Sequence, residues 1–114
     1  MKVIRGGLTV FVSIASILLC SVKVTAAELT ADREAQLVHL LKQDCGSCHG
    51  MSLKGGLGPP LLASDMHKLP VDVIKNTILF GRPGTAMPPW QNMLTEQEAL
   101  WLSKQLQQGV KTHD

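Results

Sequence analysis

The sequence predicts an all-α domain of three to four short helices. Apolar residues recur at helical spacing in three segments, and each segment is bounded by residues that start or stop helices. No segment alternates apolar and polar residues as a half-buried strand would. Glycine and proline gather between the segments, at residues 55–60 and 81–89, which we expect to be loops. A length of 114 residues allows one small domain and excludes a multidomain enzyme.

The first predicted helix begins after Thr30, whose side chain suits the N-cap position. Asp32 and Glu34 follow in the first turn, where negative charge is favourable. The apolar stripe of this helix leads to Cys45 and consists of Ala35, Leu37, Val38, Leu40 and Leu41.

Two further helices are predicted in the second half of the chain. One has Pro70 at its first position and ends at Gly81. Its inward face consists of Val71, Ile74 and Ile78. The other opens with the capping box Thr95-Glu96-Gln97-Glu98 and ends at Gly109. Its apolar residues are Ala99, Leu102 and Leu106.

Residues 1–27 have the pattern of an export signal peptide. Lys2 and Arg5 supply the positive start, and an apolar stretch runs from Leu8 to Leu19. The small residues Thr25-Ala26-Ala27 then predict cleavage after Ala26 or Ala27. Export would place the remaining domain, residues 28–114, in a bacterial periplasm, where we expect a monomer.

Two alternatives to a cleaved signal remain open. The apolar stretch from Gly6 to Val22 is at the lower limit for crossing a bilayer, so the segment is also a candidate membrane anchor. Cys20 is a candidate for lipidation, although the bulky Leu19 before it is unfavourable for that reaction. A membrane contact would follow only if this segment were retained.

The charge distribution excludes a nucleic-acid-binding protein. The formal net charge is +2, but residues 1–27 hold three basic residues and no acidic one. Residues 28–114 hold eight basic and nine acidic residues, a net charge of −1. A nucleic-acid-binding domain would need a dense basic stripe instead.

The segment Cys45-Gly46-Ser47-Cys48-His49 matches the C-x-x-C-H pattern of covalent haem c attachment. Two thiols three positions apart on a tight turn can each form a thioether with one porphyrin, and the adjacent imidazole can bind its iron. The predicted domain has few aromatic residues, and a chain of this size is difficult to stabilise without an added group. The motif therefore predicts one covalently bound haem c, with His49 as an iron ligand.

A redox-active dithiol and a zinc site are the alternatives for this cysteine pair. A dithiol of the thioredoxin type would follow a strand, whereas the residues before Cys45 have a helical pattern. A zinc site would need a second pair of ligands, which does not accompany the motif. Both alternatives are therefore less favoured than haem attachment.

The second axial position of the iron has several candidate ligands. Met87 is favoured because Pro88 and Pro89 follow it and fix two backbone φ angles, which stiffens the loop. The alternatives are an open position or one of Met51, Met66, Met93, His39, His67 and His113. Iron held by His49 and Met87 has no room for a substrate. This ligand pair predicts an electron-transfer protein and no enzyme, whereas an open or labile position would indicate a haem enzyme or a gas sensor.

The order of these elements resembles class I c-type cytochromes over the whole domain after residue 27. The matching motifs are C-x-x-C-H, Gly58-Pro59-Pro60-Leu61 and Met87-Pro88-Pro89, between a first helix and a capped last helix. The resemblance implies a fold in which the first and last helices cross beside the haem. It also implies that the carbonyl of Pro59 accepts a hydrogen bond from His49. Arg82 and Trp90 flank the ligand loop and are candidates to bind the haem propionates, with a free surface cation as the alternative for Arg82.

The two loops are similar, more narrowly, to small monohaem cytochromes found with cytochrome cd-type nitrite reductase in denitrification clusters. That likeness implies electron exchange with the nitrite reductase or with its haem d maturation proteins, and donation to a terminal oxidase is the alternative. One position departs from the wider family. Gln105 stands where class I cytochromes usually carry an aromatic residue, and Trp101, one turn earlier, is the candidate to replace it.

Residues 42–82, which include the C-x-x-C-H motif, carry a net charge of +2. We hypothesise that an exposed haem edge is surrounded by lysines and docks on an acidic partner. These lysines are Lys42, Lys54, Lys68 and Lys75. The alternative is four solvated side chains without a docking role.

Overall fold

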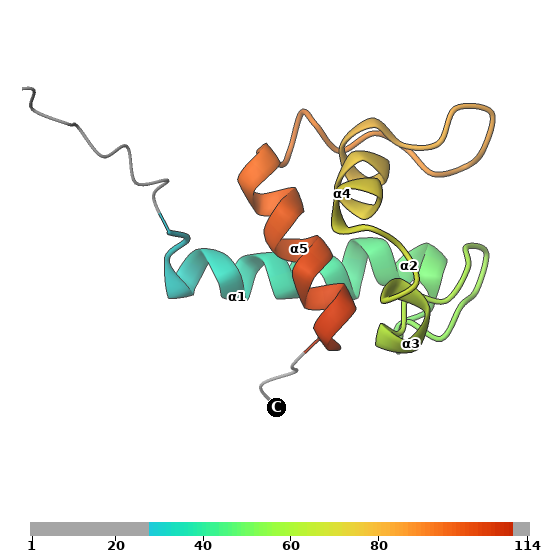
Figure 1. Cartoon of the computed structure of the whole chain (residues 1–114), viewed down its shortest axis with the longest axis horizontal. Coiled ribbons are helices and arrows are strands. Elements are labelled where there is room, and N and C mark those ends of the chain that lie inside the picture. Colours follow the sequence, from blue (N-terminus) through green and yellow to red (C-terminus); the bar gives the residue numbers. More distant parts are fainter. Residues whose placement is uncertain (1–27, 111–114) are drawn as a thin grey trace, which may run out of the picture.

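The computed structural model describes residues 28–110 of the chain. The predicted signal peptide, with Cys20, and the candidate ligand His113 lie outside the described residues. Within residues 28–110 every regular element is a helix, which confirms the predicted all-α class (Figure 1). None of the helices in this range is long and apolar enough to span a membrane.

The first helical segment runs from Ala31 to His49 and changes type along its length. It consists of α1 (Ala31–Leu40), the π-helix η1 (Leu41–Cys45) and α2 (Gly46–His49). Thr30 caps α1 as predicted, because its side-chain oxygen accepts a hydrogen bond from the backbone N–H of Arg33 at 3.3 Å. The π-helical turn was not predicted. Such turns are rare and often lie at functional sites, and this one ends at the first cysteine of the motif.

Three further helices complete the fold: α3 (Ala63–Met66), α4 (Val71–Phe80) and α5 (Glu96–Gln108). Pro70 was predicted to be the first helical residue of α4, which is wrong by one position. Its ψ of 141° is extended, so Pro70 precedes the helix at the N-cap position. Gly81 ends α4 as predicted, with a φ of +67° that suits glycine.

The predicted inward face of α4 is confirmed only in part. Ile74 is buried, whereas Val71 and Ile78 are half-buried. Leu79 is also buried, at 3% exposure, and was not predicted to face inward. The face of α4 that is covered therefore extends further round the helix than the spacing indicated.

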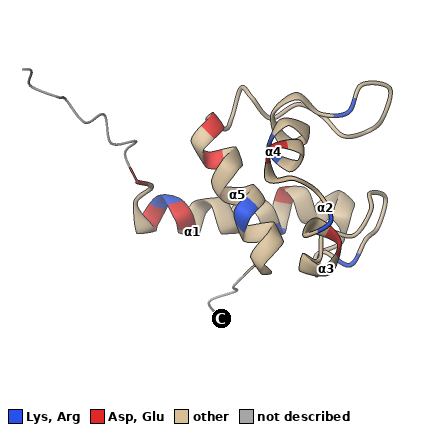
Figure 2. Ribbon diagram, viewed as in Figure 1, with Lys and Arg blue, Asp and Glu red and all other residues tan. Residues whose placement is uncertain are grey.

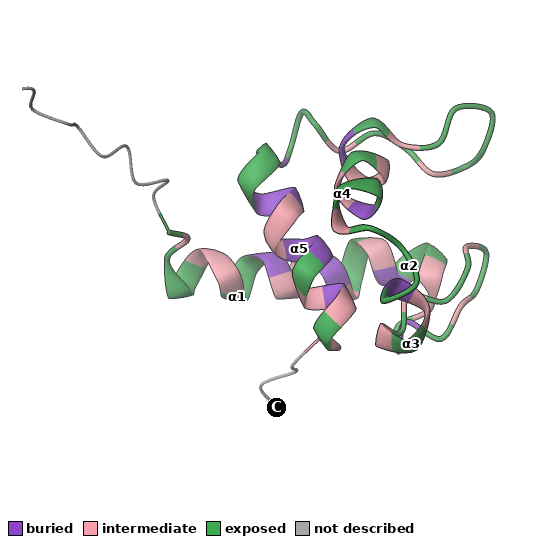
Figure 3. Ribbon diagram, in the orientation of Figure 1, coloured by how far each residue is buried: buried purple, intermediate pink, exposed green. Residues whose placement is uncertain are grey.

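The main apolar core includes the place where α5 crosses α1 (Figure 1), and Leu41 of η1 belongs to it. Four leucines in this core are at most 2% exposed, namely Leu37, Leu41, Leu102 and Leu106. Figure 3 shows the buried residues concentrated at this crossing. Burying one such side chain contributes roughly 1.5–3 kcal/mol to the stability of the fold. The crossing therefore holds the first and last helices of the domain together.

A polar contact joins the first turns of the same two helices. Arg33 Nε donates a hydrogen bond to Glu98 Oε1 at 2.5 Å. Glu98 Oε2 accepts from the backbone N–H of Thr95 at 2.8 Å, and the Thr95 hydroxyl accepts from the N–H of Glu98 at 3.2 Å. These last two hydrogen bonds confirm the predicted capping box of α5. Glu98 therefore caps α5 and also ties it to α1.

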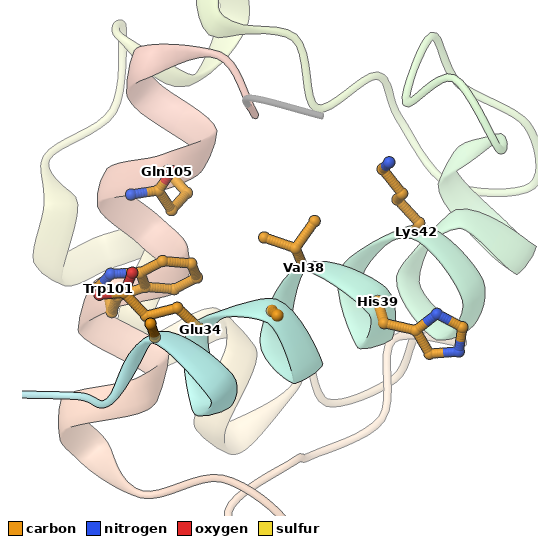
Figure 4. A pocket seen from close by; sticks show the side chains of 8 residues that line it. Glu34, Val38, His39, Lys42, Trp101 and Gln105 are labelled. Atoms are coloured by element: carbon orange, nitrogen blue, oxygen red, sulfur yellow. The ribbon is translucent and has the colours of Figure 1, made fainter. Parts of the chain in front are cut away.

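A hollow of about 560 Å³ lies beside the crossing, between α1 and α5. Trp101 and Gln105 line it from α5 and face Glu34 and Val38 on α1 (Figure 4). Trp101 is half-buried and packs against the core, but the hollow beside Gln105 remains. The tryptophan therefore replaces only part of the aromatic packing that the family resemblance implied.

Candidate functional site

The cysteine pair lies where the π-helix joins α2. Cys45 is the last residue of η1, is half-buried and packs against the core, whereas Cys48 is exposed. The Ser47 hydroxyl donates to the carbonyl oxygen of Asp44 at 2.6 Å and stabilises the turn between the two cysteines. Within residues 28–110 neither thiol forms a disulfide. They are therefore available to bond one common group.

The environment of Cys45 does not suit a dithiol nucleophile. Burial, with the nearby carboxylate of Asp44, raises the pKa of the Cys45 thiol to about 11. Such a thiol is protonated at neutral pH, whereas redox-active dithiols have a cysteine with a lowered pKa. Within residues 28–110, no three His, Cys, Asp or Glu side chains gather as the ligands of a zinc ion would.

The imidazole of His49 is held by the loop that follows α2. Its Nδ1 lies 2.7 Å from the carbonyl oxygen of Pro59. Because a carbonyl oxygen can only accept, Nδ1 carries the proton of the neutral ring and Nε2 keeps its lone pair. Gly58 lies against the same ring, since a Cβ there would be 2.7 Å from Cε1 and 2.8 Å from Nδ1. The ring is thus fixed with Nε2 as the nitrogen able to bind a metal.

Backbone hydrogen bonds fold this loop back onto α2. The N–H groups of Gly55 and Gly58 donate to the carbonyl oxygens of His49 and Cys48, each at 2.8 Å. The loop that the glycines and prolines predicted is therefore confirmed. Its closed backbone explains why Pro59, ten residues away along the chain, reaches the imidazole.

Met87 lies in a second closed loop, between α4 and α5. The backbone N–H of Arg82 donates to the carbonyl oxygen of Met87 at 3.1 Å. Gly81 lies close under this closure, because a Cβ there would be 2.6 Å from the Met87 oxygen. The Thr85 hydroxyl donates to the Arg82 carbonyl at 2.7 Å and accepts from the Met87 N–H at 3.3 Å. The backbone of Met87 is therefore held on both sides.

The other candidate iron ligands have different surroundings. Met66 is 7% exposed and belongs to the apolar core. The remaining described candidates are exposed: Met51, Met93, His39 and His67. Met87 is half-buried, and its loop extends from the same end of the molecule as the loop of Pro59 (Figure 1). These surroundings favour Met87 among the described candidates.

Arg82 and Trp90 lie near the two ends of the Met87 loop. Arg82 is exposed. Trp90 is half-buried, packs against the core, and donates its backbone N–H to the carbonyl oxygen of Ile78 at 3.0 Å. Trp90 therefore anchors the end of the loop on α4. Contacts of both side chains with haem propionates stay a prediction.

Two of the four lysines in the docking hypothesis are paired with neighbouring carboxylates. Lys68 Nζ lies 3.1 Å from Asp65 Oδ1, and Lys75 Nζ lies 3.3 Å from Asp72 Oδ1. Their charge is compensated locally. Figure 2 shows basic positions on the loop after α2 and on the Met87 loop. In the sequence these are Lys54 and Arg82, and neither residues 50–62 nor residues 81–94 contain an acidic residue. Each loop sequence thus contains one basic residue and no acidic one, Lys54 in residues 50–62 and Arg82 in residues 81–94.

Two contacts of the site were not predicted from the sequence. The first is the approach of Gly58 to the His49 ring, which has no periodic signal. The second is the pair of hydrogen bonds made by Thr85. A threonine two residues before Met87 was a usable signal for it, because Thr side chains often bond backbone groups two or three residues away.

The sequence matches the family model described as Cytochrome C oxidase, cbb3-type, subunit III, over residues 32–104. Cytochrome c55X of Pseudomonas aeruginosa is 52% identical over 79 residues, which cover 69% of this chain and 66% of that protein. Cytochrome c55X of Stutzerimonas stutzeri is 46% identical over 97 residues, 85% of either chain. A shorter match to the dihydro-heme d1 dehydrogenase of P. aeruginosa is 37% identical over 60 residues, 53% of this chain and 12% of that protein.

A solved structure of a c-type cytochrome, NirC, superimposes with a TM-score of 0.70 at 49% sequence identity and covers 72% of this chain and 96% of that one. The fold and the site therefore define a c-type cytochrome. The chain belongs to the family described by the cbb3-type subunit III model, and haem c is its covalently bound cofactor. Two free thiols on one turn and an imidazole with one fixed nitrogen fit that group. The chain is an electron-transfer protein.

Proposed function

We propose that this chain is a periplasmic single-electron carrier whose iron is bound by His49 and Met87. In this proposal Cys45 and Cys48 form the two thioether bonds to the haem, and Pro59 orients the imidazole. The observation that carries the proposal is the 2.7 Å contact between His49 Nδ1 and the Pro59 oxygen, because it leaves only Nε2 to bind iron.

When bound, the haem supplies an iron centre that gains or loses one electron. The Pro59 carbonyl keeps the proton on Nδ1 of His49 and makes the ring a stronger donor through Nε2. The thioether of Met87 is a soft ligand that favours the reduced state and raises the reduction potential. Because one loop holds the His49 ring and the other holds the Met87 backbone, we expect little rearrangement to accompany the change of charge. We further propose that Arg82 and Trp90 bind the haem propionates at the edge of the Met87 loop.

We propose that the electron partner is a cytochrome cd-type nitrite reductase or one of its haem d maturation proteins. The support comes from the loop sequences and from the relatives. One similar structure is named NirC, and a stretch similar to this chain forms part of a longer protein named dihydro-heme d1 dehydrogenase. The periplasmic location is supported by the signal-peptide pattern of residues 1–27 and by the general export of c-type cytochromes.

The ligand assignment is tested by absorption spectroscopy of the oxidised holoprotein. We expect a weak near-infrared band from sulfur bonded to ferric iron, and its loss in Met87→Ala. We also expect no carbon monoxide binding to the reduced wild-type protein at neutral pH. A pentacoordinate wild-type iron that binds carbon monoxide readily would indicate a haem enzyme or a gas sensor and would contradict the electron-carrier proposal.

The partner is tested by rapid mixing of the reduced holoprotein with oxidised nitrite reductase, and separately with the haem d maturation proteins. We expect fast oxidation of this haem by one of them. Electron donation to a terminal oxidase is a second candidate function, favoured by the family description, which names a cbb3-type oxidase. Fast oxidation by such an oxidase, with no reaction in the other mixtures, would reassign the partner.

A further inference from the structure

We propose that Thr85 is a positioning residue for the sixth ligand, and that its hydroxyl keeps the sulfur of Met87 on the iron. This inference rests on the proposed function, in which Met87 is that ligand. The side chain of Thr85 would not contact the iron. It would act through the peptide of Met87.

The Thr85 hydroxyl bridges the two sides of the Met87 loop. It donates to the carbonyl oxygen of Arg82 at 2.7 Å and accepts from the backbone N–H of Met87 at 3.3 Å. The backbone N–H of Thr85 also donates to the same Arg82 oxygen, at 3.0 Å. One side chain thus links the first residue after Gly81 to the ligand residue itself.

The Thr85 hydroxyl adds to a restraint that a backbone hydrogen bond already places on the Met87 loop. The carbonyl oxygen of Met87 accepts from the N–H of Arg82 at 3.1 Å, but this bond leaves the N–H of Met87 to another acceptor. That acceptor is the Thr85 hydroxyl. The next two residues, Pro88 and Pro89, have no N–H group with which to hold the loop. The hydroxyl therefore supplies a restraint on the Met87 peptide that the prolines cannot.

Thr85 has no part in the apolar core, since it is exposed at the tip of the loop, beside Gly84. A glycine there, with a φ of +78° and no atom within 4 Å of its Cβ position, adds conformational freedom. Removing the hydroxyl should loosen this loop and leave the helix crossing intact. Conformations in which the sulfur has left the iron then become more populated.

The population of such open conformations is measurable with exogenous imidazole. Imidazole binds ferric iron only when Met87 has left it, so its apparent affinity rises in proportion to the open fraction. We expect Thr85→Val, which keeps the shape and removes the hydroxyl, to bind imidazole about fivefold more tightly than wild type, the effect of one net hydrogen bond. We expect Thr85→Ser, which keeps the hydroxyl, to bind it like wild type.

Thr77→Val is the matched control, because the Thr77 hydroxyl also bonds a backbone carbonyl, that of Val73 at 2.8 Å, but lies on α4. We expect its imidazole affinity to be unchanged. Wild-type affinity in Thr85→Val, an equal gain in Thr85→Ser, or an equal gain in Thr77→Val would each overturn the inference. A wild-type protein without the near-infrared sulfur band would instead show that Met87 is not the ligand, and the inference would fail with that assignment.

Discussion

The guanidinium of Arg33 and the carboxylate of Glu98 form an ion pair that joins α1 to α5, with 2.5 Å between Arg33 Nε and Glu98 Oε1. The hydrogen bond from Arg33 lowers the pKa of Glu98 below its ordinary value of 4.5, against the opposing effect of burial, and the backbone N–H of Thr95 lowers it further. The carboxylate is only 10% exposed in its side chain. Its charge therefore contributes to the stability of the fold whenever Glu98 is ionised.

This relation predicts the pH dependence of stability. A carboxylate with a lowered pKa in the folded state stabilises the fold above its unfolded-state pKa, and this contribution is lost as the pH falls through the folded-state pKa. Glu98→Gln keeps the shape and the capping function but not the charge. We expect it to melt at a lower temperature than wild type at pH 7, and the difference to shrink steadily below pH 4.5.

Thr30→Ala is the control for this experiment, because it removes the neutral N-cap hydroxyl of α1, which accepts from the backbone N–H of Arg33 and is not bonded to Glu98. It should cost about 1 kcal/mol of unfolding free energy, to a similar extent at pH 7 and at a pH well below 4.5, as measured by circular dichroism in denaturant. A Glu98→Gln deficit that does not change with pH would show that the charge has no part in holding the two helices together.

A second prediction concerns the contact between Gly58 and the His49 ring. In Gly58→Ala the added methyl group would lie 2.7–3.2 Å from three ring atoms, so the imidazole must shift and its hydrogen bond to Pro59 must weaken. A weaker hydrogen bond makes His49 a poorer donor to ferric iron. We therefore expect a higher reduction potential in a voltammetric titration. We also expect overpacking to lower the free energy of unfolding by about 1–3 kcal/mol.

Gly109→Ala is the control, because it introduces backbone strain without a contact with the His49 ring. Gly109 has a φ of +82°, but a Cβ there would be an acceptable 3.8 Å from Ala63. Backbone strain should lower the free energy of unfolding of this variant by about 1 kcal/mol, and its reduction potential should equal that of wild type. If Gly58→Ala also kept that potential, the Pro59 contact would have no influence on the iron.

A third prediction follows from the charges of the two loops. Lys54 is exposed and lies on a segment without acidic residues, whereas Lys68 is already paired with Asp65. We expect Lys54→Glu to slow electron transfer to an acidic partner severalfold at low ionic strength, and the difference to fade as salt is added. Lys104→Glu, on α5, is the control. Rates that do not vary with ionic strength, in wild type or variant, would exclude electrostatic docking.

The parts of the fold that were predicted correctly have local signals. Thr30 and the Thr95–Glu98 box bond to backbone groups within one turn, so a few adjacent residues determine where their helices begin. The π-helix that ends at Cys45 and the burial of Leu79 were missed because neither has such a local signal. The pairing of Lys68 with Asp65 had a local signal, the spacing of three residues, which the docking hypothesis did not use.

The features of the candidate site also separate into those with a local sequence signal and those without one. The C-x-x-C-H motif indicated haem c because all of its residues lie within five positions, and the contact of Pro59 with His49 was implied by the family resemblance alone. The assignment of Met87 as ligand stays a prediction. The two hydrogen bonds of the Thr85 hydroxyl depend on how residues 81–87 fold back on themselves. Neither the positions of the prolines nor the spacing of apolar residues predicts that fold.

The hollow between α1 and α5 gives a fourth prediction. Gln105 is half-buried at its wall, and the space of about 560 Å³ beside the helix crossing is open enough for a larger ring (Figure 4). Gln105→Phe would cover the apolar surfaces of Val38 and Ala35, which line the same hollow. Because filling such spaces commonly adds about 0.5–2 kcal/mol, we expect a higher denaturant midpoint and an unchanged reduction potential. Gln108→Phe, at the exposed end of α5, should give no such gain, and an equal gain from it would mean that surface hydrophobicity, rather than the helix crossing, is responsible.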